Sequence, residues 1–334
     1  MKYIYNSTDS TILIISSPFQ ALCAISAIRN LCLEEYTVLA LLPVKEIRNE
    51  QVVSLLKYYQ VAFHVQYITR KEEIRLRILA FLRPPGKFSR VFIGNYNDLN
   101  LKLTAFKYLK RGGTIIHLDD GIATISLLQN KLFSIGFLQK EYLNFLGYSR
   151  NVDYYSNLYT IYSDIPNKKY KIQGNQLRCL SEKNTKEKGG VYFIGTNTSV
   201  YCGRQKVPIK SFENYLESLF IEILAKYPHE SIYYVPHGRD NSDFVRALCD
   251  KHQVIFLRPK TCVEVMLLQA KLIPTAIIGF TSTALFNIKN IFPSTSVINI
   301  LINSQQEGSD YLRLKEVSNY YSRHEIQLIE KCLT

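Results

Sequence analysis

Residues 231–240 read SIYYVPHGRD, a short β-branched and aromatic run that ends abruptly in a polar turn. Residues 232–235 predict a strand. The turn that follows places His237 and Arg239 just beyond the carboxyl end of that strand. In open α/β sheets ligands bind at this end of the strands, and a histidine beside an arginine suits an anionic ligand such as a phosphate. A polar turn without a ligand explains the same residues equally well.

The chain before this stretch alternates between strand and helix patterns from its start. Residues 11–15, TILII, predict a fully buried strand, and Ser16-Ser17-Pro18 supplies a cap and a first-turn proline for a helix to about residue 30. Further strands are predicted at 36–42, 61–68, 91–93 and 114–118, and helices at 46–59, 71–82 and 99–109. This alternation predicts a parallel, doubly wound sheet.

The alternation pauses in the middle of the chain and then restarts. Residues 131–170 are rich in Tyr, Phe, Lys and Asn, which fits an insertion that binds an acceptor or a membrane, or helices packed beneath loops. Residues 181–190, SEKNTKEKGG, are charged and end in two glycines, as interdomain linkers do. We therefore predict an N-terminal domain over 1–180, a linker over 181–190 and a C-terminal domain over 191–315.

The C-terminal domain repeats the α/β pattern. Strands are predicted at 191–194, 232–235, 254–257, 274–280 and 295–302, and helices at 212–226, 244–250, 262–271 and 284–288. Residues 315–333 predict an amphipathic helix, and we assign residues 316–334 to a separate C-terminal helix, with packing against the N-terminal domain as an option.

Composition and charge restrict the class of protein. With 334 residues, 47% of them hydrophobic and 21% charged, the chain is long enough for two folded domains. The net charge of +13 indicates an anionic partner, which includes nucleic acid, a membrane face and an anionic substrate. The seven cysteines form no CxxC pair, so we expect reduced thiols and no zinc knuckle. The sequence has no run of about 18 apolar residues and no signal-peptide pattern, so we expect a soluble, cytoplasmic protein.

Two adjacent carboxylates, Asp119 and Asp120, follow the strand predicted at 114–118 and precede Gly121. Consecutive residues point to opposite faces of a strand, so at most one of the two carboxylates should face a crevice while the other bonds to local backbone. An Asp-Asp-Gly turn with no functional role is equally consistent with this motif.

Small hydroxyl residues follow the strand predicted at 274–280. Residues 281–283 read Thr-Ser-Thr and precede a helix, where hydroxyls are natural caps and the first amides can bind an anion. The candidate ligand-binding residues of the C-terminal domain also include residues after two other strands and in one helix. Together they are Gly195, Thr196, Pro236, His237, Arg239, Glu264, Thr281, Ser282 and Thr283.

These motifs, in this order, resemble the bacterial sialyltransferases of glycosyltransferase family 52, which act on lipooligosaccharide and capsule. The residues that carry the resemblance are the acidic motif Asp119-Asp120-Gly121, the histidine motif YVPHGR at 234–239, the hydroxyls at 281–283 and the SSPFQ segment at 16–20. The resemblance implies a GT-B fold, in which two Rossmann-like, doubly wound domains face each other across a cleft. It also makes the N-terminal domain the acceptor side and the C-terminal domain the CMP-sugar side.

The resemblance implies an inverting transfer of N-acetylneuraminic acid from CMP-Neu5Ac to a galactose-type hydroxyl. Asp120, or else Asp119, would be the general base, and His237 would bind and could protonate the CMP phosphate with help from the hydroxyls at 281–283. Glu264 lies where related enzymes place a glutamate on the donor ribose. No cofactor and no metal are expected, because a monophosphate leaving group carries less charge than a diphosphate. Some relatives use a carboxylate nearer the histidine, which here would be Glu213 or Glu217.

Other functions fit parts of the sequence. A GT-B transferase that uses another CMP-nonulosonic acid or a UDP-hexose would share the same fold and cleft. The charge and the 24 tyrosines would also suit a basic nucleic-acid-binding protein, but the lysines are dispersed and no RRM, KH or helix-turn-helix signature is present. The expected partners are therefore the CMP-sialic acid donor and a galactose-terminated glycan, without nucleic acid. Peripheral contact with the anionic inner membrane and a homodimer are further options.

Overall fold

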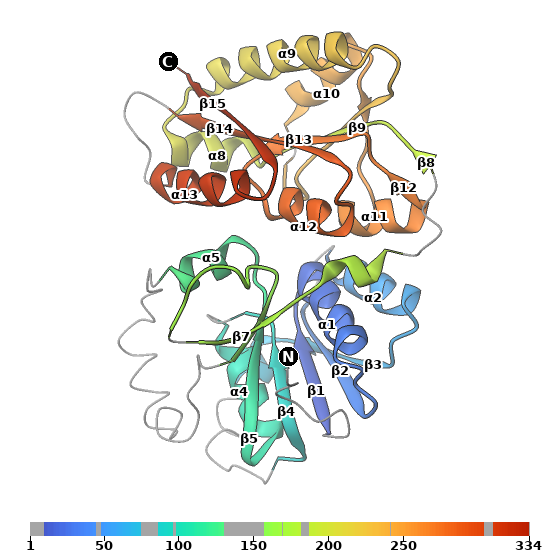
Figure 1. Cartoon of the computed structure of the whole chain (residues 1–334), viewed down its shortest axis with the longest axis vertical. Coiled ribbons are helices and arrows are strands. Elements are labelled where there is room, and N and C mark those ends of the chain that lie inside the picture. The colour runs from blue at the N-terminus through green and yellow to red at the C-terminus, as the bar shows by residue number, and fades with distance from the viewer. Residues whose placement is uncertain are drawn as a thin grey trace. The chain divides into compact units, whose positions relative to one another are not determined.

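The computed structural model describes residues 10–44, 48–74, 86–95, 98–129, 157–168, 170–181, 187–240, 242–303 and 310–333. The chain divides into two compact units, Met1–Leu180 and Ser181–Thr334. Figure 1 shows that each unit is built on its own sheet.

The N-terminal unit is a parallel α/β domain. Its described strands form one sheet in the order β3-β2-β1-β4-β5-β6-β7, and every pair is parallel. The strands are β1 (Thr11–Ile15), β2 (Tyr36–Pro43), β3 (Phe63–Ile68), β4 (Phe88–Ile93), β5 (Leu109–Leu118), β6 (Asn157–Thr160) and β7 (Lys171–Gly174). The helices are α1 (Pro18–Asn30), α2 (Arg48–Tyr58), α4 (Leu99–Tyr108), α5 (Ile122–Leu128) and the 3₁₀ turn η1 (Leu177–Leu180).

Local sequence explains the first β-α unit. All five residues of β1 are buried, as expected for an apolar strand in the middle of a parallel sheet. Helix α1 begins where Ser17 accepts a hydrogen bond from the Gln20 amide and Pro18 fills the first turn. Helix α1 thus starts directly at the carboxyl edge of the sheet, next to the end of β1.

The C-terminal unit repeats the parallel α/β plan. Its larger described sheet has the order β11-β10-β9-β13-β14-β15, and β8 pairs with β12 in a separate ribbon. The strands are β8 (Glu187–Lys188), β9 (Val191–Ile194), β10 (Ile232–Val235), β11 (Ile255–Phe256), β12 (Leu272–Ile273), β13 (Ala276–Phe280), β14 (Ser296–Asn303) and β15 (Ile326–Cys332). The helices are α8 (Thr198–Gln205), α9 (Ile209–Lys226), α10 (Asp243–Lys251), α11 (Val263–Ala270), α12 (Thr283–Ile291) and α13 (Tyr311–Ser322). In Figure 1, α9 and α10 cover one face of this sheet, and α11, α12 and α13 cover the other. The predicted pair of Rossmann-like, doubly wound domains is therefore confirmed.

The predicted C-terminal helix is wrong in its second half. Helix α13 ends at Ser322, Glu325 takes a left-handed conformation with φ of 59°, and the chain continues as the edge strand β15. β15 pairs in parallel with β14 over its whole length and so belongs to the C-terminal unit. The exposed edge of β14 provides hydrogen-bond partners that local periodicity does not reveal.

Three other predicted segments extend beyond the described residues. Residues 75–82 of one predicted helix, residues 131–156 of the aromatic segment and residues 182–186 of the linker lie outside them. Within the described parts, residues 157–160 form strand β6 of the N-terminal sheet, and residues 187–188 form strand β8 of the C-terminal unit.

Candidate functional site

The N-terminal sheet has its topological switch point between β1 and β4. From β1 the strand order proceeds to β2 and β3 on one side, and from β4 to β5, β6 and β7 on the other. Ligands of doubly wound sheets bind outside the carboxyl ends of the strands at this point. Here Ser16 follows β1, Gly94 follows β4, and Asp120 follows the next strand, β5.

Asp119 is fully buried and held on both carboxylate oxygens. Thr160 donates its hydroxyl to Oδ1 at 2.5 Å, and the amide of Ile161 donates to Oδ2 at 2.8 Å. Burial raises the pKa of Asp119 to about 7, and these hydrogen bonds act in the opposite direction. Asp119 therefore ties the end of β5 to the residues that end and follow β6, and its carboxylate lies away from solvent.

Asp120 has a different environment from its neighbour. Its side chain is half-buried, and Gln20 of α1 donates from Nε2 to its Oδ1 at 3.3 Å. Burial raises the pKa of Asp120, the Gln20 hydrogen bond lowers it, and the charge of Asp98 raises it. Of the two predicted bases, Asp120 is therefore the one that is partly exposed.

The C-terminal sheet has its switch point between β9 and β13. From β9 the order proceeds to β10 and β11, and from β13 to β14 and β15. Gly195 and Thr196 follow β9, and residues 281–283 follow β13, while the histidine motif follows β10 beside them. All but one of the predicted ligand-binding residues lie after one of these three strands or at the start of α12, where ligands of such sheets bind. The exception is Glu264, which lies within helix α11.

His237 and Arg239 are exposed at the end of β10, after the buried Pro236. The backbone N–H of Arg239 donates to His237 Nδ1 at 3.2 Å, and the Asp240 amide donates to the His237 carbonyl at 2.8 Å. Because Nδ1 accepts a hydrogen bond, the neutral imidazole carries its proton on Nε2. The turn therefore presents His237 as an N–H donor, as a phosphate oxygen requires.

Asp240 was missed by the sequence analysis, although it organises this turn. Its side chain is 5% exposed, and it accepts hydrogen bonds from the Thr198 amide at 3.3 Å and the Ser242 hydroxyl at 2.7 Å. Arg258 donates to its carbonyl oxygen at 2.5 Å. Asp240 thus joins the loops after β9, β10 and β11, through its buried carboxylate and its backbone carbonyl. The sequence shows only an Asp three residues after the histidine, and its burial is known from the structure alone.

The hydroxyl residues after β13 differ in what they contact. Ser282 accepts a hydrogen bond from the Ala284 amide at 3.3 Å and so caps α12, as predicted. The Thr281 hydroxyl lies 3.1 Å from that of Ser318 in α13, which directs it toward the helix layer. Thr283, the first residue of α12, is partly exposed. Ser282 and Thr283 therefore remain the better candidates for ligand contact.

Glu264 and Gly195 have structural surroundings. Glu264 is 5% exposed and accepts a hydrogen bond from Asn287 Nδ2 at 2.9 Å, which joins α11 to α12. A Cβ at Gly195 would lie 2.2 Å from the Tyr234 hydroxyl oxygen. A glycine is therefore required above this buried ring.

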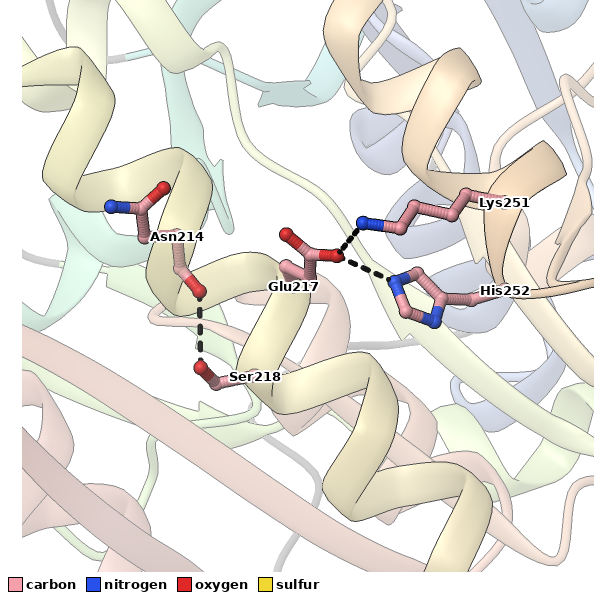
Figure 2. A network of polar contacts seen from close by, with 5 residues as sticks. All are labelled: Asn214, Glu217, Ser218, Lys251 and His252. Atoms are coloured by element: carbon pink, nitrogen blue, oxygen red, sulfur yellow. Dashed lines mark hydrogen bonds and ion pairs between the residues drawn. The ribbon is translucent and has the colours of Figure 1, made fainter.

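The alternative bases Glu213 and Glu217 lie on α9. Figure 2 shows Glu217 bonded to Lys251 and His252, at 2.6 and 2.9 Å from its Oε1. Lys251 and His252 are at the end of α10, whereas the His237 turn precedes the start of that helix, so Glu217 is bonded to the opposite end of α10 from the histidine motif. Glu213 pairs with Lys210 at 3.1 Å.

The described residues show neither a metal-binding cluster nor a membrane-spanning helix. Among these residues, no three His, Cys, Asp or Glu side chains form a group able to hold a metal ion. No helix within the same ranges is long and apolar enough to cross a bilayer.

Comparison with known proteins identifies the fold. No protein-family model and no curated protein matches the chain. Several solved structures are similar to it, among them the following three. One, from Listeria monocytogenes and described as a UDP-N-acetylglucosamine 2-epimerase, has a TM-score of 0.55 and 8% identity, over 95% of this chain and 90% of that one. Another UDP-N-acetylglucosamine 2-epimerase has a TM-score of 0.50 and 11% identity, over 92% and 81%. MurG of Acinetobacter baumannii has a TM-score of 0.45 and 10% identity, over 96% and 86%.

The two epimerase structures establish the fold class, since their scores reach 0.5. Together with the two parallel sheets, the similarity confirms the predicted GT-B fold. At 8% and 11% identity it carries no information about substrate.

Proposed function

We propose that this chain is an inverting, metal-independent sialyltransferase of glycosyltransferase family 52, which transfers N-acetylneuraminic acid from CMP-Neu5Ac to a galactose-type hydroxyl of a bacterial surface glycan. The observation that carries the proposal is the pairing of two sites on one chain. In the N-terminal unit, the half-buried carboxylate of Asp120 lies beside the switch point of the sheet. In the C-terminal unit, the His237 N–H donor and the capped start of α12 lie next to the switch point of the other sheet.

In the proposed reaction, one group accepts the proton of the acceptor hydroxyl and the others stabilise the leaving group as its bond to the sugar breaks. Asp120 takes the proton of the acceptor hydroxyl as its oxygen attacks the anomeric carbon of the sugar. The bond from that carbon to the phosphate oxygen breaks, and its electron pair leaves with CMP. His237 Nε2–H, Ser282 and Thr283 stabilise the charge that develops on the phosphate, with Arg239 as a cationic neighbour. The leaving monophosphate carries less charge than a diphosphate, which is why we propose a reaction without metal.

Three of the other predicted residues have a structural role in this proposal, because their side chains are already bonded within the protein. Asp119, Thr281 and Glu264 already bond to Thr160, Ser318 and Asn287. Their expected role is to hold the ends of β5, β13 and α11 in place.

A transferase that uses a UDP-hexose is the main alternative. It would share the fold that this chain has in common with two structures described as UDP-N-acetylglucosamine 2-epimerases. Another CMP-nonulosonic acid would leave every step above unchanged.

Equilibrium binding measured by calorimetry separates these alternatives. We expect CMP to bind the full chain and UDP and UDP-N-acetylglucosamine to bind at least tenfold more weakly, with CMP affinity reduced about tenfold in His237→Ala. Lys210→Ala is the control, because Lys210 pairs with Glu213 on α9. Tight binding of the uridine nucleotides alone would replace the sialyltransferase with a UDP-sugar enzyme. Retention on heparin without any nucleotide binding would favour the nucleic-acid alternative.

The net charge suggests where the protein works. We propose peripheral association with the anionic inner face of the cell membrane, where lipid-linked acceptors are made. Sedimentation with anionic vesicles that is lost above about 0.5 M salt would support this location, and salt-independent or absent binding would contradict it.

A further inference from the structure

Gln20 occupies the switch point of the N-terminal sheet, in the first turn of α1. Its side chain is only 2% exposed, although glutamine is normally a surface residue. A buried amide needs partners for both ends. Its partners come from two separate strand ends, which makes Gln20 a link between β1 and β5.

The orientation of the amide follows from its partners. The Ser16 backbone N–H and hydroxyl donate to Gln20 Oε1 at 2.8 and 3.1 Å. With Oε1 directed to these two donors, the amide must turn its Nε2 toward Asp120, whose Oδ1 lies 3.3 Å away. The Asp120 carboxylate thus faces the Gln20 Nε2–H donor, and a flip of the Gln20 amide would break its two hydrogen bonds to Ser16.

Gly94 encloses the same side chain from the end of β4. A Cβ at this position would lie 2.1 Å from Gln20 Cδ and Oε1, and 2.6 Å from Cγ. The Gly94 amide is fixed by donation to the Ile14 carbonyl at 3.2 Å. Any larger residue would therefore displace the amide of Gln20 from its place between Ser16 and Asp120.

We propose that Gln20 is a positioning residue, which holds the Asp120 carboxylate at the switch point and favours its ionised form. A fixed N–H donor stabilises a carboxylate more than it stabilises the neutral carboxylic acid. The inference rests on the proposed function only in taking Asp120 as the base that must be ionised for turnover.

The ionisable groups around Asp120 are few in the described structure. Asp98, at the start of α4, and the adjacent Asp119 are acidic, and the buried thiol of Cys23 lies on α1. Burial is the main cause that raises the pKa of Asp120, and the charge of Asp98 adds to it. Gln20 is thus the neighbour identified as opposing protonation of this group.

The test is a titration of Asp120 in the full chain by ¹³C-carboxyl NMR, assigned with Asp120→Asn, in parallel with kcat/KM as a function of pH. Gln20→Met keeps the size and removes the donor, so we expect the apparent pKa of Asp120 and the acid limb of the rate profile to move up by about one pH unit. Gln20→Glu should move both further, because it adds a like charge. Gly94→Ala should move both in the same direction.

Gln205→Met is the matched control, since Gln205 is equally buried, at 1% exposure, on α8 of the other unit. It should leave the titration and the acid limb in place even if it lowers stability. Unchanged titration of Asp120 in both Gln20 variants would overturn the inference and leave the proposed function standing. A shifted titration in a chain without transferase activity would support the role of Gln20 and reject the proposed function.

Discussion

Asp119 and Asp120 are adjacent in sequence and differ in what surrounds them. Asp119 is enclosed and bonded to Thr160 and Ile161, whereas Asp120 is half-buried and bonded to Gln20. The alternation of side chains along an extended segment separates the two carboxylates. Asp119 therefore has a structural role, while the partly exposed Asp120 is the carboxylate that the proposed reaction uses.

The raised pKa of Asp119 predicts a pH-dependent stability. The pKa is about 7 in the folded chain and near 4 when unfolded, so folding takes up a proton between these values. Its contribution is complete below about pH 4 and is lost as the pH rises through 7. We expect the free energy of unfolding of Asp119→Asn to fall less than that of wild type between pH 5 and 7.5, by roughly 2 kcal/mol. Urea unfolding at both pH values measures this, and parallel losses in the two chains would contradict it.

His237 offers a second prediction at this scale. Since the Arg239 amide donates to Nδ1, the neutral ring should be the Nε2–H tautomer in the protein without ligand. The ¹⁵N chemical shifts of the imidazole, assigned with His237→Ala, report the tautomer directly. A predominant Nδ1–H form would show that the turn is arranged differently and that His237 cannot donate from Nε2.

The sequence predicted where the candidate residues that stand in short motifs lie in the fold. Asp120, His237 and Ser282 each follow a recognisable strand, so their placement at the carboxyl edges was predictable. Gln20 and Asp240 were not assigned roles, because their contacts join segments about 100 and 42 residues apart. No local spacing contains such information.

At the scale of elements, the parallel α/β order was predictable because apolar strands and amphipathic helices alternate along the chain. Helix α1 and strand β1 match the predicted ranges, including the Ser17 cap. The segment that forms strand β15 was predicted as helix, because its apolar residues fit both helical and strand periodicity. Its conformation is determined by pairing with the edge of β14, which local sequence does not reveal. The short helix α8 was also missed, although Asn197 caps it.

Proline substitutions test the pairing of β15. The Leu333 amide donates to the Asn303 carbonyl, so alternate residues before it, including Gln327, direct their N–H toward β14. Gln327→Pro should lower the free energy of unfolding by roughly 2 kcal/mol. Glu330→Pro, compared with Glu330→Ala, should cost much less, because that N–H points outward. Equal losses at both positions in thermal unfolding would argue for a helix over 326–332.

At the scale of the whole molecule, each unit has one switch point with polar residues at the carboxyl edge of its sheet. The N-terminal unit supplies Gln20 and Asp120, and the C-terminal unit supplies His237, Ser282 and Thr283. In the proposed reaction the base acts on the acceptor and the histidine side acts on the leaving group. Transfer should therefore require both units, whereas nucleotide binding should require the C-terminal one.

The most direct test of the proposed function is acceptor-dependent release of CMP from CMP-Neu5Ac in the presence of EDTA and lactose. We expect wild type to turn over, Asp120→Asn and His237→Ala to lose at least a hundredfold in kcat/KM, and Lys210→Ala to retain activity. CMP affinity should survive in Asp120→Asn and fall in His237→Ala. Turnover that needs an added divalent cation, or that persists in Asp120→Asn, would contradict the proposed mechanism, and no release of CMP with any galactose-terminated acceptor would contradict the function itself.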